Sequence, residues 1–236
     1  MLQARHHDRI GDVLNSPPVA YAVVTMAIAI VMSSCGGGGS EDGTFDQAAQ
    51  DIREEDQTRA EGIVLVLADF PTGWRAVQSD DEAEPPKCFG FGLFDLTMTG
   101  RAESSKFAKG EVTTATSGAA IFDSERDAVA AFERLANQDL ADCYASWLRE
   151  RSDDDVRVDV SAGELSFPTF GDRSAAYQVT AELQANAFPP SVLIDLVFIQ
   201  EERALAILIF LDVSSAFSSS EMEDLAGLIA GRMGPP

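Results

Sequence analysis

The sequence predicts an α+β domain in which an antiparallel β-sheet is flanked by helices. Three observations favour this fold class. Strand-like apolar segments recur along the chain, and the last two are separated by the short polar turn Gln200–Arg203, as in an antiparallel hairpin. Amphipathic segments with helix-capping residues lie among them. Of the 236 residues, 45% are apolar, which is enough for a hydrophobic core and excludes wholesale disorder.

Residues 1–34 have the order of a secretory signal peptide. A polar start with two arginines precedes the apolar run Val19–Met32, and small residues follow it. This run of 14 residues would rise about 21 Å as a helix, less than the roughly 30 Å of a bilayer's hydrocarbon core. A permanent transmembrane helix is therefore the weaker interpretation.

The segment Met32–Cys35 resembles the lipobox of bacterial lipoproteins. The resemblance implies that Cys35 is acylated on sulfur and becomes the first residue of the mature chain. The protein would then be attached by its lipid to the extracytoplasmic face of the cell membrane. A secreted soluble form and an uncleaved anchor are the two alternatives.

Residues 35–60 are expected to be a Gly-rich, acidic tether and spacer, which leaves 61–236 as the globular domain. Gly36–Gly39 and Ser40 have the composition of a flexible linker. The spacing of apolar residues from Phe45 to Ile52 permits a polar helix in the spacer.

The first half of the domain is predicted to contain two strands. Phe70–Gly73 carries turn residues, and the strand Trp74–Gln78 should place its indole on the core. An acidic loop at 80–86 and an irregular aromatic segment at 89–96 follow. The second strand, Val112–Phe122, is rich in β-branched residues.

A long amphipathic helix should come next, starting at a capping box of Ser124 and Asp127, continuing to Trp147 and breaking near Asn137. The final helix is predicted to start at a capping box of Ser220 and Glu223 and to end near Gly231. Between the helices lie four predicted strands, of which the last two have nearly continuous apolar runs that indicate the buried centre of the sheet. These strands are Val156–Val160, Ala175–Leu183, Val192–Ile199 and Ala204–Leu211.

The cysteine count predicts one disulfide. Acylation of Cys35 leaves Cys88 and Cys143, and such a pair in an exported protein is expected to be oxidised. A metal site and a catalytic thiol are the alternatives. Both histidines, His6 and His7, fall in the signal peptide, so Ser-His and Cys-His catalysis and His-containing zinc sites are excluded from the mature chain. We expect no metal site and no cofactor.

The net charge of −22 argues against nucleic acid as a partner, because an acidic surface repels phosphate backbones. It also argues against electrostatic binding to anionic lipid. Contact with the membrane is therefore expected through acylated Cys35.

Two short segments and the order of the elements carry a family resemblance. Residues 67–74 read Leu-Ala-Asp-Phe-Pro-Thr-Gly-Trp, and residues 170–174 read Phe-Gly-Asp-Arg-Ser before a pair of strands. The chain resembles small actinobacterial-type lipoproteins and the extracellular sensor domains of PknH-like receptor kinases, whose fold is similar to the PsbP-like fold. The resemblance implies a ligand-sensing or scaffolding role, and not an enzyme.

Asp195 interrupts a buried strand, so its carboxylate must be paired or neutralised. It is either a ligand-binding group or half of a salt bridge, with Arg173 or Arg203 as partner. Arg173 itself either faces a cleft with Asp172 or belongs to a tight turn that caps a strand. The acidic clusters at 80–82 and 153–155 either bind Ca²⁺ weakly or are solvated loops.

Several aromatic residues are candidates for an apolar pocket, with packing beside the disulfide as the alternative. They are Trp74, Phe89, Phe91, Phe94 and Trp147.

The sequence thus predicts a binding module for a small apolar or amphipathic ligand or for an envelope protein. The alternative is a hydrolase of cell-envelope material that uses paired carboxylates. No such pair is evident in the sequence. A purely structural role is a third interpretation.

Overall fold

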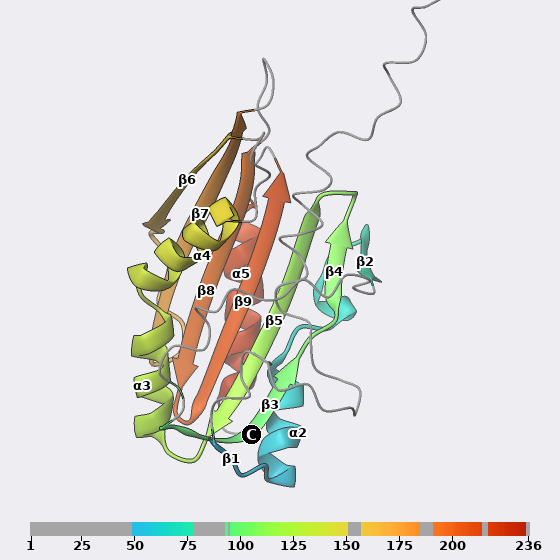
Figure 1. The fold of residues 1–236 in the computed structure, drawn as a ribbon. Helices are drawn as coiled ribbons and strands as arrows, with labels where there is room; N and C mark the ends of the chain where they lie inside the picture. The colour runs from blue at the N-terminus through green and yellow to red at the C-terminus, as the bar shows by residue number, and fades with distance from the viewer. Residues whose placement is uncertain are drawn as a thin grey trace, which may run out of the picture.

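The computed structural model describes residues 49–77, 93, 95–150, 157–184, 191–213 and 217–234 (Figure 1). The predicted signal peptide, Cys35 and the glycine tether lie outside these residues, as do Cys88, Phe89, Phe91, Phe94 and both acidic clusters. Lipidation and the Cys88–Cys143 disulfide therefore stay predictions. Among the described helices, none is long and apolar enough to cross a membrane.

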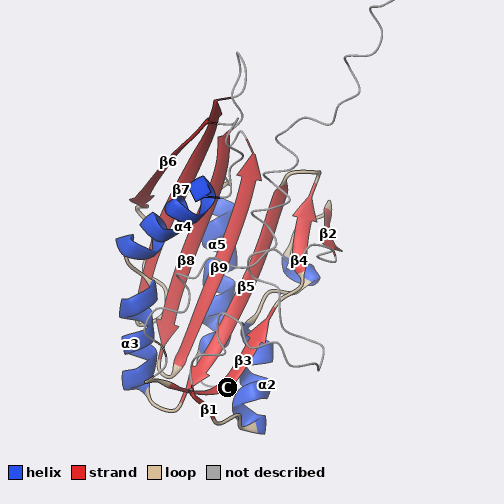
Figure 2. Cartoon of the chain, in the orientation of Figure 1, coloured by secondary structure: helices blue, strands red, loops and turns tan. Residues whose placement is uncertain are grey.

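The described residues form an α+β fold, as predicted. Its sheet contains nine strands, and the main path has the order β1-β3-β5-β9-β8-β7-β6 (Figure 2). Only β1 pairs in parallel, with β3. The path strands are β1 Ala49–Gln50, β3 Thr97–Glu103, β5 Thr113–Phe122, β6 Arg157–Glu164, β7 Arg173–Gln184, β8 Ser191–Glu201 and β9 Ala204–Val213. Two short strands, β2 (Trp74–Val77) and β4 (Lys106–Lys109), pair with each other beside β5.

Helices cover both faces of the sheet. The helices α3 (Glu125–Leu135) and α4 (Gln138–Glu150) pack on one face, whereas α2 (Glu54–Ile63) and α5 (Ser219–Met233) pack on the other. A short 3₁₀ turn, Leu67–Asp69, follows α2. Each face has its own hydrophobic cluster, because successive side chains of a strand point to opposite sides.

The prediction that the last hairpin forms the centre of the sheet is confirmed. Strand β8 pairs with β7 and β9, and β9 pairs with β8 and β5, all antiparallel. Of the turn residues between them, Glu202 has a positive φ of 49°. Because both faces of these strands are covered, their sequences read as continuous apolar runs rather than as an alternation.

The predicted break in the long helix is also confirmed. The α3 helix starts after Ser124, whose hydroxyl accepts a hydrogen bond from the Asp127 amide. Asn137 separates α3 from α4, and its Oδ1 accepts a hydrogen bond from the Leu140 amide at 3.1 Å. The last helix is capped by Ser218 and not by Ser220 as predicted, because the Ser218 hydroxyl accepts from the Glu221 amide.

The α2 helix spans residue 60, where the sequence places the boundary between spacer and domain. Asp56, Ala60 and Ile63 of this helix are buried, so the folded part includes residues that the sequence assigned to the spacer. The helix lies so close to β3 that a Cβ on Gly100 would come within 2.3 Å of the Asp56 carbonyl. The two strands β3 and β4 were not predicted.

Candidate functional site

A strip of polar side chains crosses the sheet on the face that carries α5. Gln178 of β7 pairs with Asp195 of β8. In the next row, Ser161 pairs with Thr180, Thr180 with Leu193, and Leu193 with Asp212. These residues alternate with members of the α3/α4-side cluster, so they point to the α5 side. We define the polar strip as Thr113, Ser161, Gln178, Thr180, Asp195 and Asp212.

Two hydrogen bonds fix the carboxylates of the strip. Gln178 Nε2 donates to Asp195 Oδ1 at 2.8 Å, and Thr113 Oγ1 donates to Asp212 Oδ2 at 2.7 Å. Asp195 pairs with Phe210, two residues before Asp212, so the two carboxylates are diagonal neighbours on adjacent strands. The Cα atoms of such neighbours lie about 7 to 8 Å apart.

The strip passes from solvent to the interior. Ser161 is exposed and Gln178 and Thr180 are half-buried, whereas Asp195 and Asp212 are only 2% and 8% exposed. Beside Ser161, a Cβ built on Gly163 would meet no heavy atom within 4 Å, so the sheet surface is open there. A ligand can therefore reach the β6 and β7 part of the strip, while the two acids on β8 and β9 are buried.

The environment of Asp195 favours its protonated form. Burial raises the pKa of Asp195, the hydrogen bond from Gln178 partly opposes this, and the charge of Asp212 raises it further. The main role of Asp195 in this arrangement is to hold Gln178. Its Oδ1 takes one amide hydrogen of Gln178 and leaves the other hydrogen and the carbonyl oxygen of that side chain available.

A row of aromatic rings continues from the strip on the same face. Phe210 is the register partner of Asp195. Its ring centroid lies 4.6 Å from that of Phe217, and the ring centroid of Phe217 lies 6.0 Å from that of Trp74. The ring centroids of Trp74 and Phe70 are 4.6 Å apart, and Trp74 Nε1 donates a hydrogen bond to Glu221 Oε1 at 3.2 Å. Trp74 is buried, as the sequence predicted, and the rings pack against one another. Trp74 and Asp195 thus belong to one face of the sheet.

The other predicted site residues do not join this group. Trp147 lies on α4 on the opposite face of the sheet, and its ring centroid is 6.3 Å from that of Tyr144. Arg173 is at the start of β7, where its Nη1 lies 3.4 Å from Glu133 Oε1. Phe91 and Phe94 lie outside the described residues.

The two salt-bridge partners predicted for Asp195 are wrong. Arg173 binds Glu133 and Arg203 binds Asp56, and the hydrogen bond of Asp195 comes from Gln178. The reason is register: Arg173 pairs with Gln200, five residues along β8 from Asp195. Gln178 does contact Asp195, but the sequence does not single it out. It is one of the polar residues in a strand whose polar and apolar residues alternate, a pattern typical of side chains that face solvent.

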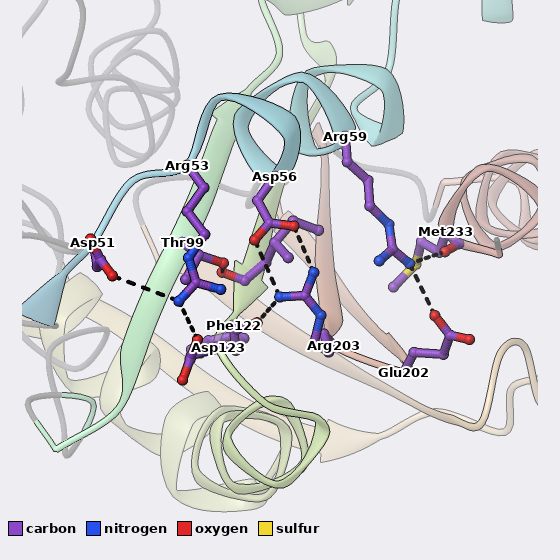
Figure 3. A network of polar contacts seen from close by, with 11 residues as sticks. Asp51, Arg53, Asp56, Arg59, Thr99, Phe122, Asp123, Glu202, Arg203 and Met233 are labelled. Atoms are coloured by element: carbon purple, nitrogen blue, oxygen red, sulfur yellow. Dashed lines mark hydrogen bonds and ion pairs between the residues drawn. The ribbon is translucent and has the colours of Figure 1, made fainter. Parts of the chain in front are cut away.

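A second polar cluster lies at the opposite end of the sheet, where α2 meets the β8–β9 turn (Figure 3). Arg203 binds both carboxylate oxygens of Asp56, at 2.7 and 3.2 Å, and also donates to the Phe122 carbonyl at 2.8 Å. Arg53 binds Asp123 at 2.5 Å, and Arg59 donates to the Met233 carbonyl at 2.7 Å. We call these contacts the basal network.

The basal network is best explained as a structural clamp. Its charges are paired with one another, and they join α2 to the ends of β5, β9 and α5. A hollow beside it, lined by Arg53, Glu54, Glu55 and Thr58, is open and has charged walls. Within the described ranges, no group of three or more His, Cys, Asp or Glu side chains is placed to hold a metal ion.

Comparison with known protein families and with curated proteins finds no match to this chain.

Proposed function

We propose that this chain is a lipid-anchored, extracytoplasmic binding module of the sensor type, and that the polar strip is its binding surface. One observation carries the proposal: a row of polar side chains runs across neighbouring strands from exposed Ser161 to buried Asp195, to which Gln178 donates a hydrogen bond. A sheet face with a purely structural role would be more stable if its side chains were apolar or fully solvated, because half-buried polar groups lose hydration.

The alternation of the strands explains how such a surface is held in place. The opposite side of β7 and β8 contributes Tyr177, Val179, Ile194 and Leu196 to the core beneath α3 and α4. The strip therefore stands on a rigid sheet and not on a loop. Sites on rigid elements hold their groups in a more precise geometry.

The polar strip lies away from the end of the sheet that holds β1 and α2. Acylated Cys35 would enter the bilayer, and the 14 positions from Cys35 to Ala49 span at most about 50 Å. β1 and α2 are clamped at the basal end of the sheet (Figure 1). Leu193 lies eight residues from Glu201 along β8, so the strip is roughly 25 Å beyond that end.

We also propose that the domain has a PsbP-like or sensor-domain-like fold. An antiparallel sheet with helices on both faces is what the resemblance to PsbP-like and sensor domains implies. Such a domain, tethered by lipid and without a catalytic histidine in the mature chain, fits a role in binding a small ligand or an envelope protein.

Membrane fractionation and native mass spectrometry together test the proposal. Wild-type protein should be recovered in the membrane fraction with a lipid mass on Cys35, and Cys35→Ser should carry no such mass. Wild-type protein released from the envelope with detergent should retain a bound molecule or partner. An unmodified Cys35 in the wild-type protein would contradict the lipid anchor, and a wild-type chain without any bound molecule or partner would contradict the binding role.

A hydrolase of envelope material is the second candidate, and the neighbouring carboxylates Asp195 and Asp212 are the observation in its favour. A pair of carboxyls on adjacent strands, with a raised pKa on one of them, is the kind of group that acts as acid and base in glycoside hydrolysis. Their burial argues for binding instead, since an acid must reach the scissile bond. Turnover of an envelope glycan fraction that Asp195→Asn abolishes would favour hydrolysis.

A further inference from the structure

The chemical groups of the polar strip narrow the class of ligand. Ser161 and Thr180 offer hydroxyls that both donate and accept hydrogen bonds, and Gln178 offers an amide that does the same. A ligand that matches them must itself donate and accept along its whole length. A polyhydroxylated chain does so, because each of its hydroxyls is both donor and acceptor.

Apolar and anionic ligands fit this surface poorly. An apolar ligand would remove water from the Ser161, Thr180 and Gln178 side chains without replacing their hydrogen bonds, which costs free energy for each group. An anion would be repelled by Asp159 and Glu182, exposed register partners next to Ser161 and Thr180 on the same two strands, and by a chain of net charge −22. The strip itself contains no basic residue.

The spacing of the groups suits an extended ligand that lies across the strands. Ser161 and Thr180 are direct register partners on β6 and β7, and Gln178 is two residues from Thr180 on the same strand. Neighbouring strands are about 4.8 Å apart, close to the length of one hexose unit. Gly163, the register partner of Gln178, leaves the surface open beside these groups.

We propose that the polar strip binds an uncharged oligosaccharide through Ser161, Thr180 and Gln178, with Asp195 holding Gln178 in position. This inference rests on the proposed function, in that it takes the strip to be a binding surface. It replaces the apolar or amphipathic ligand expected from the sequence with a polyhydroxylated one. The ligand would lie at the end of the sheet opposite the basal network.

The test uses the full acylated protein in detergent and three probes: a neutral hexasaccharide, a hexasaccharide of uronic acid, and a lysine hexapeptide. Isothermal titration should detect the neutral hexasaccharide, with at least tenfold weaker binding of the uronic acid chain. Thr180→Val keeps the branched shape and should weaken binding about tenfold. Thr58→Val, at an exposed position of α2, is the matched control and should leave binding unchanged.

Each contrary result has a distinct meaning. Binding of the neutral probe that Thr180→Val and Ser161→Ala leave unchanged would overturn the site. Preference for the lysine peptide or the uronic acid chain would overturn the ligand class. If no glycan binds but the protein still retains a partner from the envelope, the inference fails and the proposed function stands. If it retains nothing and binds no probe, both fail.

Discussion

Asp56 of α2 and Arg203 of the β8–β9 turn form a two-pronged ion pair, with Nη2 to Oδ1 at 2.7 Å and Nη1 to Oδ2 at 3.2 Å. The pair joins α2 to the central hairpin of the sheet. Asp56 is 2% exposed, so its charge depends on this partner. The arrangement explains why α2, which has a polar sequence, is nevertheless part of the domain.

Replacement of Asp56 should destabilise the fold strongly. We expect Asp56→Asn to lower the free energy of unfolding by about 3 kcal/mol, because it leaves the Arg203 guanidinium without its ionic partner. Urea unfolding followed by circular dichroism measures the change. The exposed Asp51→Asn is the control and should cost less than about 0.5 kcal/mol. Equal effects of the two substitutions would contradict the clamp.

The same variant should reveal a pH dependence. Burial acts to raise the pKa of Asp56, but hydrogen bonds from Arg203 and Thr99 and the charges of Arg203 and Arg53 outweigh it and lower the pKa. The stabilisation is therefore complete above the unfolded value of about 3.9 and is lost as the pH falls through the lowered folded value. The difference between wild type and Asp56→Asn should shrink only in strong acid.

Gly100 should not tolerate a side chain. A Cβ there would lie 2.3 Å from the Asp56 carbonyl carbon and oxygen, so Gly100→Ala must push α2 off β3. We expect a loss of about 1 to 3 kcal/mol in the free energy of unfolding, as for overpacked cores. Gly118→Ala on β5 is the control, since its nearest atom would be the Ala102 carbonyl oxygen at 3.8 Å. A milder effect at Gly100 than at Gly118 would refute the close contact.

Ionisation of Asp195 should lower the stability of the fold, whereas ionisation of Asp56 raises it. The raised pKa of Asp195 means that the folded state holds the proton more tightly, so stability is lost as the pH rises from the unfolded value of about 3.9. Asp195→Asn keeps the acceptor for Gln178 and removes the charge. Thermal unfolding at pH 7 should show a higher melting temperature for Asp195→Asn than for wild type, and this difference should disappear near pH 3. Destabilisation at pH 7 would show that the charge is compensated.

Glu103 on β3 provides a second titration at higher pH. Burial raises the pKa of Glu103 to about 7, and the charge of Arg101 opposes the shift. Wild-type stability should therefore fall between about pH 4.5 and pH 7 relative to Glu103→Gln, and the difference should stay constant above pH 7. Melting temperatures from pH 4 to pH 8 measure this. Glu125→Gln, on the exposed start of α3, is the control.

The predicted Cys88–Cys143 disulfide can be tested by counting thiols. The exported protein, unfolded without reductant, should show no reactive thiol, because Cys35 would be acylated and the other two oxidised. Two reactive thiols would refute the disulfide. Closing a loop of about 55 residues should stabilise the fold by about 4 kcal/mol in the chain-entropy model, so reduction should lower the melting temperature markedly.

The sequence determined the parts of the fold that depend on local patterns. The apolar runs of β8 and β9 with a polar turn between them predict a central hairpin, and Ser124 and Asn137 mark the starts of α3 and α4. By contrast, β3 contains Gly100 and a register shift, and β4 has only four residues, so neither shows a clear period of two.

Only the tertiary structure decided which residues of distant segments meet. Asp195 is recognisable in the sequence as a polar residue in an apolar strand, but its partner depends on the register of β7 against β8, which places Gln178 beside it and Arg173 far away. The sequence places residues 54–60 of the polar α2 helix in the spacer because the ion pair that attaches Asp56 involves Arg203, 147 positions away. Such long-range pairing is fixed by the packing of the whole sheet, and a local pattern carries no record of it.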